Sequence, residues 1–233
     1  MLAIDPDELL LAYRLGVFPM AEHRESSGVL WIRPRERCIL PLDDFHVPKR
    51  LARTVRSDHF EVRTDSVFGE VIRACAGSSP QRGETWINQA IIDVFETLHA
   101  RGAAHSIETF EDGRLVGGLY GLSIGAAFFG ESMFSLRADA SKVALVHLAA
   151  RLKAGNYALL DAQFPNPHLG QFGALTVSER EFERLLEDAL PRQADFYSLG
   201  GASGPGATKL PSGPKTTGSG GGSSVLQVIT QTS

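Results

Sequence analysis

Glu131 is the one charged residue in an apolar, glycine-rich stretch that runs from Gly117 to Phe134. The glycines leave gaps between larger side chains, which is typical of paired strands whose backbones another group must approach closely. Burying a lone carboxylate in such a wall costs free energy unless it meets a cation or several hydrogen-bond donors. Glu131 is therefore either the polar centre of a site or a strand end at a wet edge, and its spacing leaves both open.

Asp161 and Gln163 form a second polar pair. They end an apolar run that we expect to be a strand from Ala158 to Gln163, and a spacing of two puts both side chains on one face of a strand. The two cysteines, Cys38 and Cys75, are too few for a disulfide framework and lack a zinc-like spacing. We therefore expect no metal site, no redox chemistry and no cofactor.

Basic residues gather between positions 33 and 56. Those at helical intervals after Pro48 are Lys49, Arg50, Arg53 and Arg56, and those before them are Arg33, Arg35 and Arg37. They form either a local nucleic-acid-binding face or a solvated face offset by nearby aspartates. The formal net charge of −4 argues against salt-driven nucleic-acid binding by the whole surface.

Helices and strands alternate along the first hundred residues. Caps and apolar spacing predict helices from Asp5 to Gly16, near 48–56, after Asp65 as its cap, and from Ile87 to Gly102. An extended turn at 17–20 leaves the first helix, and short strands are expected at 38–40 and 60–64.

A change to period two at His105 predicts a sheet in the second half of the chain. The Asp112-Gly113 turn and a second turn at 123–125 connect three antiparallel strands that end near Phe134. We expect a helix from Ser141 to Gly155, the strand at 158–163, a last strand at 174–177, and a final helix capped by Ser178. This order predicts an α+β fold with a mixed, largely antiparallel sheet flanked by helices.

The composition is that of a soluble protein. The 233 residues are 43% hydrophobic and 21% charged, and no apolar run approaches the roughly 20 residues that span a bilayer. The first residues lack the features of a secretion signal. We therefore expect a cytoplasmic protein, without a membrane partner, that acts as a monomer.

Beyond Leu199 the sequence becomes rich in Gly, Ser, Pro and Thr. We expect a disordered tail over residues 192–233. Within it, Val225 to Thr230 is uncharged and β-prone, so this segment is either a strand that pairs with an exposed edge or a remnant without a function.

Eight short motifs occur together and in order along residues 5–191. They are Leu10 to Met20, Thr85-Trp86-Ile87, His105 to Glu108, Gly117 to Gly121, Gly130 to Ser135, Ala140 to Lys142, Asp161 to Gln163, and His168 to Ala174. In this combination the chain closely resembles the leucyl/phenylalanyl-tRNA–protein transferases. The tail is not covered by the resemblance.

The resemblance implies a small N-terminal domain at 1–36 followed by a catalytic domain at 37–191, similar to that of the GNAT acetyltransferases. It implies transfer of Leu or Phe, and also of Met, from leucyl-tRNA or phenylalanyl-tRNA to the α-amino group of proteins that begin with Arg or Lys. The product is an N-degron that marks the protein for proteolysis. Conversion of an ester into an amide needs neither ATP nor metal, so positioning, solvent exclusion and proton handling remain for the protein.

The resemblance also assigns roles to residues. An apolar pocket for the Leu or Phe side chain would be lined by Leu119, Phe128, Met133, Leu145 and Leu148. Trp86 would stack on the terminal adenosine, and its partner position is Met20, where some relatives carry Trp. The basic helix with Lys49, Arg50, Arg53 and Arg56 would contact the acceptor stem.

Glu131, Asp161 and Gln163 match the family's reaction centre. Glu131 and Asp161 are expected to hold the cationic acceptor. A neutral amide is a weak base, so we expect Gln163 to orient the amine through its carbonyl, with Asp161 fixing the amide, rather than to take a proton.

Two other interpretations stay open. A GNAT-type acyltransferase would use an acyl-CoA, but the segment from Ser135 to Ser141 has no glycine for a phosphate-binding turn and contains Asp139. A catalytically silent tRNA- or peptide-binding module would keep the pocket without turnover.

Ile32 departs from the family, whose members commonly have two tryptophans followed by Ser-Pro in this region. The departure puts the packing between the two expected domains in question.

Overall fold

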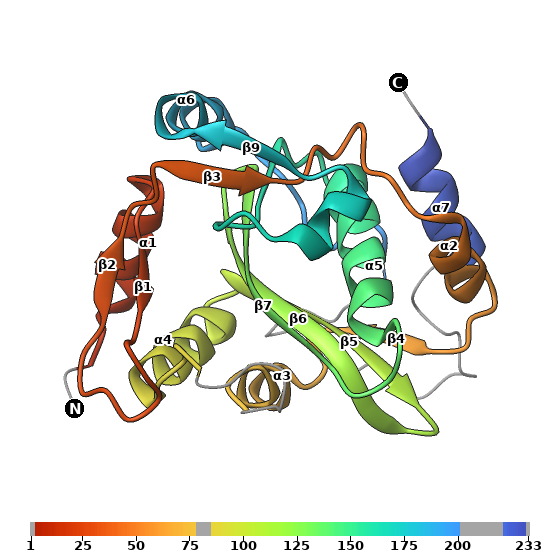
Figure 1. Cartoon of the computed structure of the whole chain (residues 1–233), viewed down its shortest axis with the longest axis horizontal. Helices are drawn as coiled ribbons and strands as arrows, with labels where there is room; N and C mark the ends of the chain where they lie inside the picture. Colours follow the sequence, from red (N-terminus) through yellow and green to blue (C-terminus); the bar gives the residue numbers. More distant parts are fainter. Residues whose placement is uncertain (1–2, 78–84, 201–220, 232–233) are drawn as a thin grey trace.

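The computed structural model describes residues 3–77, 85–200 and 221–231. A seven-stranded sheet in the order β4-β5-β6-β7-β8-β3-β9 forms its centre, and a small two-stranded sheet lies beside it (Figure 1). The strands of the large sheet are β3 (Glu36–Ile39), β4 (Glu61–Thr64), β5 (Ala104–Glu111), β6 (Arg114–Ile124), β7 (Ala127–Ser135), β8 (Leu159–Asp161) and β9 (Leu175–Ser178). The predicted α+β class with a mixed, largely antiparallel sheet is confirmed.

Strands β5, β6 and β7 form the predicted antiparallel meander. Asp112 and Gly113 turn the first hairpin with positive φ angles of 50° and 73°. Helix α5 (Ala140–Ala154) then crosses over to β8, which pairs with β7 in parallel. Strand β3, from early in the chain, lies between β8 and β9, so the sheet joins segments that are distant in sequence.

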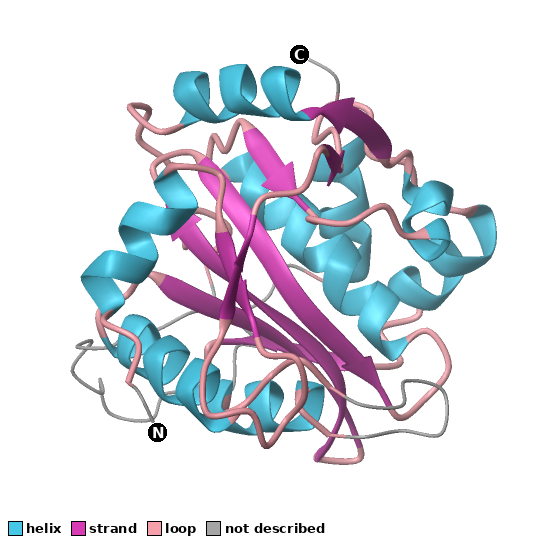
Figure 2. Ribbon diagram, turned by 60° about the vertical axis from the view of Figure 1, so that its left-hand side comes forward, coloured by secondary structure: helices cyan, strands magenta, loops and turns pink. Residues whose placement is uncertain are grey.

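Helices cover both faces of the large sheet (Figure 2). Helix α5 packs on one face with α2 (Lys49–Arg56) and α7 (Gly222–Thr230). The other face carries α1 (Pro6–Arg14), α3 (Phe68–Cys75), α4 (Gln89–Ala100) and α6 (Glu179–Ala189). Side chains of the central strands alternate between these two cores, as the period of two requires.

The N-terminal segment packs against the second core. The Asp5 carboxylate caps α1 by accepting bonds from the amides of Asp7 and Glu8, as predicted. The expected extended turn is in fact strand β1 (Phe18–Met20), which pairs with β2 (Leu30–Ile32), a strand that we had not predicted. The Tyr13 ring contacts Phe129 of β7 at 5.0 Å, so this segment shares apolar packing with the large sheet.

Asp65 does not cap α3, which begins after Val67. Its backbone is left-handed, with φ of 54°. Its carboxylate accepts from the Ser106 amide at 2.7 Å and the Tyr197 hydroxyl at 2.7 Å, and lies 2.8 Å from His105 Nδ1. The residue that looked like a local cap therefore fastens the chain after α6 to strand β5.

The prediction of a disordered tail is wrong for two parts of it. Phe196 is buried and stacks on His105 at 4.0 Å, and Arg151 donates to its carbonyl oxygen at 2.9 Å. Residues 225–230 belong to helix α7 instead of forming a strand. Val225 and Ile229 are one helical turn apart and bury one face together, and this packing outweighs a β preference worth about 1 kcal/mol. The predicted disorder at 201–220 lies outside the described residues.

Candidate active site

Glu131 occupies a β-bulge in β7. Tyr120 of β6 pairs with Ser132 and Gly121 pairs with Gly130, so Glu131 is the extra residue between two ladder positions. A bulge of this kind redirects a side chain out of the regular alternation. The Glu131 side chain is 7% exposed, so the alternative of a strand end at a wet edge does not hold.

Gln163 makes a polar contact with Glu131. Its Nε2 donates to Glu131 Oε1 at 2.7 Å. Strand β8 ends at Asp161, so the expected strand to Gln163 is two residues too long. Gln163 instead has φ of 63°, a left-handed conformation that is uncommon for a residue other than glycine. Its backbone N–H donates to Asp161 Oδ1 at 2.8 Å, and this bond supports the conformation.

Asp161 is engaged by Arg37. Nε of Arg37 lies 2.9 and 3.1 Å from the two carboxylate oxygens, and Nη2 lies 2.6 Å from Oδ2. Arg37 also donates to the Gly16 carbonyl at 2.9 Å, and its guanidinium lies over the Phe18 and Phe182 rings at 4.8 and 4.3 Å. Both members of the pair are fully or almost fully buried. Asp161 thus fixes the backbone of Gln163 rather than its side-chain amide, and its carboxylate is already paired with a cation.

The interpretation of Arg37 as part of a basic surface face is therefore wrong. The available signal was its place in an apolar strand sequence, Cys38-Ile39-Leu40, where a buried cation needs a partner.

Burial raises the pKa of Glu131 to about 8, and the Asp161 carboxylate adds to the rise, whereas the Arg37 guanidinium and the hydrogen bond from Gln163 oppose it. This shift favours the protonated form of the carboxyl at neutral pH. Its Oε2 and the hydroxyls of Tyr13 and Tyr120 are buried without hydrogen-bond partners in the described part of the chain. The site therefore combines a carboxyl whose neutral form is favoured with polar atoms that have unused hydrogen-bonding capacity.

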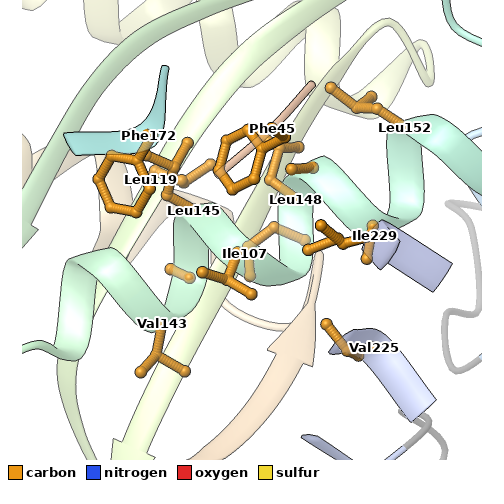
Figure 3. Packing of buried hydrophobic residues seen from close by; sticks show 14 of the residues in the cluster. Phe45, Ile107, Leu119, Val143, Leu145, Leu148, Leu152, Phe172, Val225 and Ile229 are labelled. Carbon is orange, nitrogen blue, oxygen red and sulfur yellow. The ribbon is translucent and has the colours of Figure 1, made fainter. Parts of the chain in front are cut away.

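An apolar cavity of about 190 Å³ opens beside Glu131. Four of the five residues expected in the pocket line it: Leu119, Met133, Leu145 and Leu148. Leu40, Leu160 and Leu169, which were not anticipated, complete its apolar wall. Figure 3 shows Leu119 and Leu145 close together, with Phe172 beside them.

Phe128 is not among the residues that line this cavity. It is fully buried, and its ring stacks on Phe196 at 5.7 Å with an interplanar angle of 9°. A Cβ at position 121 would overlap the Phe128 ring, so Gly121 provides the space that this ring occupies. The structure therefore places Phe128 behind the pocket, in the core.

A second, more polar cavity of about 250 Å³ adjoins the first. Trp86 and Met20 both line it, together with Gln163 and the exposed Phe164. The Ala21 amide donates to the Trp86 carbonyl at 3.0 Å, which holds the end of β1 next to the Trp86 loop. Glu131, Ala162 and Asn166 line both cavities, so the two spaces meet at the polar centre. Of these three, Ala162 and Asn166 were missed by the sequence reasoning.

The basic helix α2 is as predicted. Its buried face consists of Leu51, Ala52 and Val55. The exposed residues are Lys49, Arg50, Arg53 and Arg56. Arg50 approaches Asp139 at 4.0 Å, but is 85% exposed, so this ion pair contributes little. The structure thus brings four cations together on a solvent-facing surface.

In the described residues no group of three or more His, Cys, Asp or Glu side chains could hold a metal ion. No helix among them is long and apolar enough to cross a membrane.

Comparisons with known proteins identify the family. Two family models match: "Leucyl/phenylalanyl-tRNA protein transferase" over residues 39–187, and the N-terminal domain of the same name over residues 3–35. Relatives that bear this name come from Phenylobacterium zucineum (53% identical, spanning all of both chains) and Caulobacter vibrioides (55% identical, covering 87% of this chain and 94% of the relative). Another, from Rhizorhabdus wittichii, is 51% identical over all of both chains, so two of the alignments include the residues after Leu199. The chain belongs to the leucyl/phenylalanyl-tRNA–protein transferase family.

Proposed function

We propose that this protein transfers leucine or phenylalanine from leucyl-tRNA or phenylalanyl-tRNA to the α-amino group of proteins that begin with Arg or Lys. Family membership supports the aminoacyltransferase activity. The observation that carries the proposal is the junction of two unlike cavities at Glu131 and Gln163. An aminoacyl-adenosine end has the same division, with an apolar side chain on one side of the ester and a nucleoside on the other.

The apolar cavity receives the amino-acid side chain in this proposal. Its walls from β6, β7 and α5 leave a narrow space between Leu119, Met133 and Leu148. Such a space accepts side chains that branch beyond Cβ better than Val or Ile, although one methyl group contributes only about 1–3 kcal/mol of discrimination.

The polar cavity receives the terminal adenosine. Trp86 offers a flat aromatic surface for stacking, which contributes about 1–3 kcal/mol per base. Met20 lies in the same cavity, so its thioether provides a weaker, polarisable contact where some family members have a second aromatic ring.

The reaction itself is aminolysis of an ester. The α-amino nitrogen of the acceptor attacks the ester carbonyl carbon, the bond from that carbon to the ribose oxygen breaks, and the proton lost by the amine ends on that oxygen. With Nε2 directed to Glu131, the carbonyl oxygen of Gln163 is the atom that accepts a hydrogen bond from the amine. We infer that Gln163 orients the amine and does not act as its base.

Glu131 has two tasks in this proposal. It fixes the Gln163 amide, and it meets the cationic acceptor at the junction. A cation next to a carboxyl favours its ionised form, so acceptor binding lowers the pKa of Glu131 and releases a proton. Asp161, whose carboxylate is paired with Arg37, acts in this proposal by holding the backbone of Gln163.

The competing acyl-CoA interpretation loses support at the start of α5. Asp139 is the N-cap of this helix and has φ of 67°, and the Ser141 amide already donates to Ser135 Oγ at 3.2 Å. A carboxylate at this position repels a pyrophosphate. Helix α2 supports tRNA as the donor instead, since exposed cations position a phosphate backbone without reading its sequence.

A mass-spectrometric assay tests the proposal. Purified protein is incubated with phenylalanyl-tRNA and a peptide that begins with Arg, and an N-acetylated peptide and acetyl-CoA serve as controls. One added phenylalanine, on the free-amine peptide alone, is the expected result. No mass change with the tRNA still charged favours the silent binding module, and acetylation of the peptide favours the acyl-CoA enzyme.

A further inference from the structure

Helix α7 packs against a surface formed by α2 and α5. Its apolar face consists of Val225, Leu226 and Ile229, which are 3–6% exposed. Figure 3 shows Val225 and Ile229 on the side of α7 that faces α5. A helix of nine residues is too short to be stable alone in water, so the helical structure of α7 depends on packing against α2 and α5.

Charged side chains fix both ends of α7. Asp58 Oδ1 accepts from the Gly222 amide at 2.7 Å, and Lys153 Nζ donates to the Ile229 carbonyl at 3.2 Å. An anion at the first turn and a cation at the last turn are the arrangement that a helix dipole favours. The surface formed by α2, α5 and the flanking Asp58 is therefore complementary to α7 in both charge and shape.

The first turn of α7 touches the backbone of α2. A Cβ at position 222 would overlap the carbonyl oxygen of Val55, in the last turn of α2. The neighbouring Gly221 differs, because the nearest atom to its Cβ would be Asp58 Oδ2 at 3.5 Å, an ordinary contact. Glycine at 222, and not at 221, permits the close approach of the two helices.

The contact with α7 leaves the basic face of α2 open. Lys49, Arg50, Arg53 and Arg56 remain exposed while Leu51, Ala52 and Val55 are buried. Asp58, which is two positions beyond Arg56, is engaged by the α7 amide. The exposed side chains of α7 are uncharged (Ser223, Ser224, Gln227 and Thr230), so α7 adds no negative charge beside the cations.

We propose that α7 is a positioning element for aminoacyl-tRNA binding: it braces the last turn of α2 and thereby holds Arg53 and Arg56 in place for the acceptor stem. This proposal depends on the proposed function, because it assumes that α2 contacts tRNA. It goes beyond that function by giving the segment after residue 220 a role in donor binding.

The pair Gly222→Ala and Gly221→Ala tests this role, since both variants add one methyl group to neighbouring positions. The donors are phenylalanyl-tRNA and phenylalanyl-adenosine, which lacks the acceptor stem. We expect Gly222→Ala to raise KM for phenylalanyl-tRNA roughly two- to fivefold, about the loss of one exposed ion-pair contact. Its kinetics with phenylalanyl-adenosine should equal those of the wild type, and Gly221→Ala should match the wild type with both donors.

A merely structural helix gives a different pattern. Two results would overturn the proposal that α7 braces α2. One is an equal loss of kcat/KM with both donors, and the other is an unchanged KM for phenylalanyl-tRNA although the Tm of Gly222→Ala falls. If Gly222→Ala does not fold, Ile229→Val is used instead, and the salt dependence of its Kd for uncharged tRNA must weaken. Wild-type protein that transfers phenylalanine from neither donor refutes the proposed function and the brace with it, whereas an active wild type with an unaffected Gly222→Ala refutes the brace alone.

Discussion

Arg37 and Asp161 form a buried, bidentate ion pair between residues that are 124 positions apart. The pair connects three parts of the molecule, because Arg37 also donates to the Gly16 carbonyl and Asp161 also accepts from the Gln163 backbone N–H. The geometry of Gln163 at the proposed reaction centre thus depends on an arginine that does not line either cavity.

Arg37→Lys is expected to lower kcat roughly ten- to hundredfold with little change in KM for aminoacyl-tRNA, because a single ammonium cannot replace the bidentate fork and Gln163 shifts. Steady-state kinetics at a temperature well below Tm measure this. The control is Arg33→Lys, an exposed arginine that binds Glu183. Equal kinetics for the two variants would exclude a positioning role for Arg37.

Gln163→Ala and Gln163→Glu are expected to lose activity by similar factors, since neither presents a neutral carbonyl held by Glu131. Single-turnover rates over a range of pH provide the comparison. A Gln163→Glu variant that is faster than the wild type at high pH would show base catalysis at this position instead of orientation.

Glu131 is expected to make stability fall as the pH rises. Its pKa is about 8 in the folded protein against an ordinary value of 4.5, so between these values the folded state holds a proton that the unfolded chain has released. Glu131→Gln should therefore raise Tm relative to the wild type at pH 9 more than at pH 5. Glu187→Gln, on the exposed face of α6, should not change this dependence, and parallel Tm profiles for wild type and Glu131→Gln would contradict the assignment.

Leu148→Phe is expected to narrow the apolar cavity and to reduce kcat/KM for phenylalanyl-tRNA more than for leucyl-tRNA. The ratio of the two should shift by about tenfold or more, within the 1–3 kcal/mol that a pocket contact controls. Competition between the two charged tRNAs measures this ratio directly. Leu152→Met, one turn further along α5 and outside the cavity lining, is the control, and an equal shift there would show a general packing effect.

Arg53→Gln combined with Arg56→Gln is expected to raise KM for tRNA and to reduce the salt slope of log K by about one per lost phosphate contact. The matched control is Arg180→Gln with Arg184→Gln, which removes the same charge from the exposed face of α6. If both double variants have the same salt slope, the effect belongs to net charge and not to α2.

Local chemistry was enough to predict most elements. The Asp5 and Ser178 caps both form as expected, because a cap needs only the amides two or three residues onward. The Asp112-Gly113 turn follows from two residues that tolerate positive φ. The apolar lining of the pocket was expected from the family resemblance alone, and Leu119, Met133, Leu145 and Leu148 do line one cavity, whereas Phe128 does not.

Long-range packing determined the rest. The bulge at Glu131 depends on the register between β6 and β7, and the burial of Arg37 depends on the insertion of β3 between β8 and β9. Local propensity also fails to predict helix α7, since a segment with strand propensity becomes helical where α2 and α5 present an apolar surface. Periodicity and caps act over a few residues, whereas pairing partners and burial are set by segments far away in the chain, and they are defined only when the fold is complete.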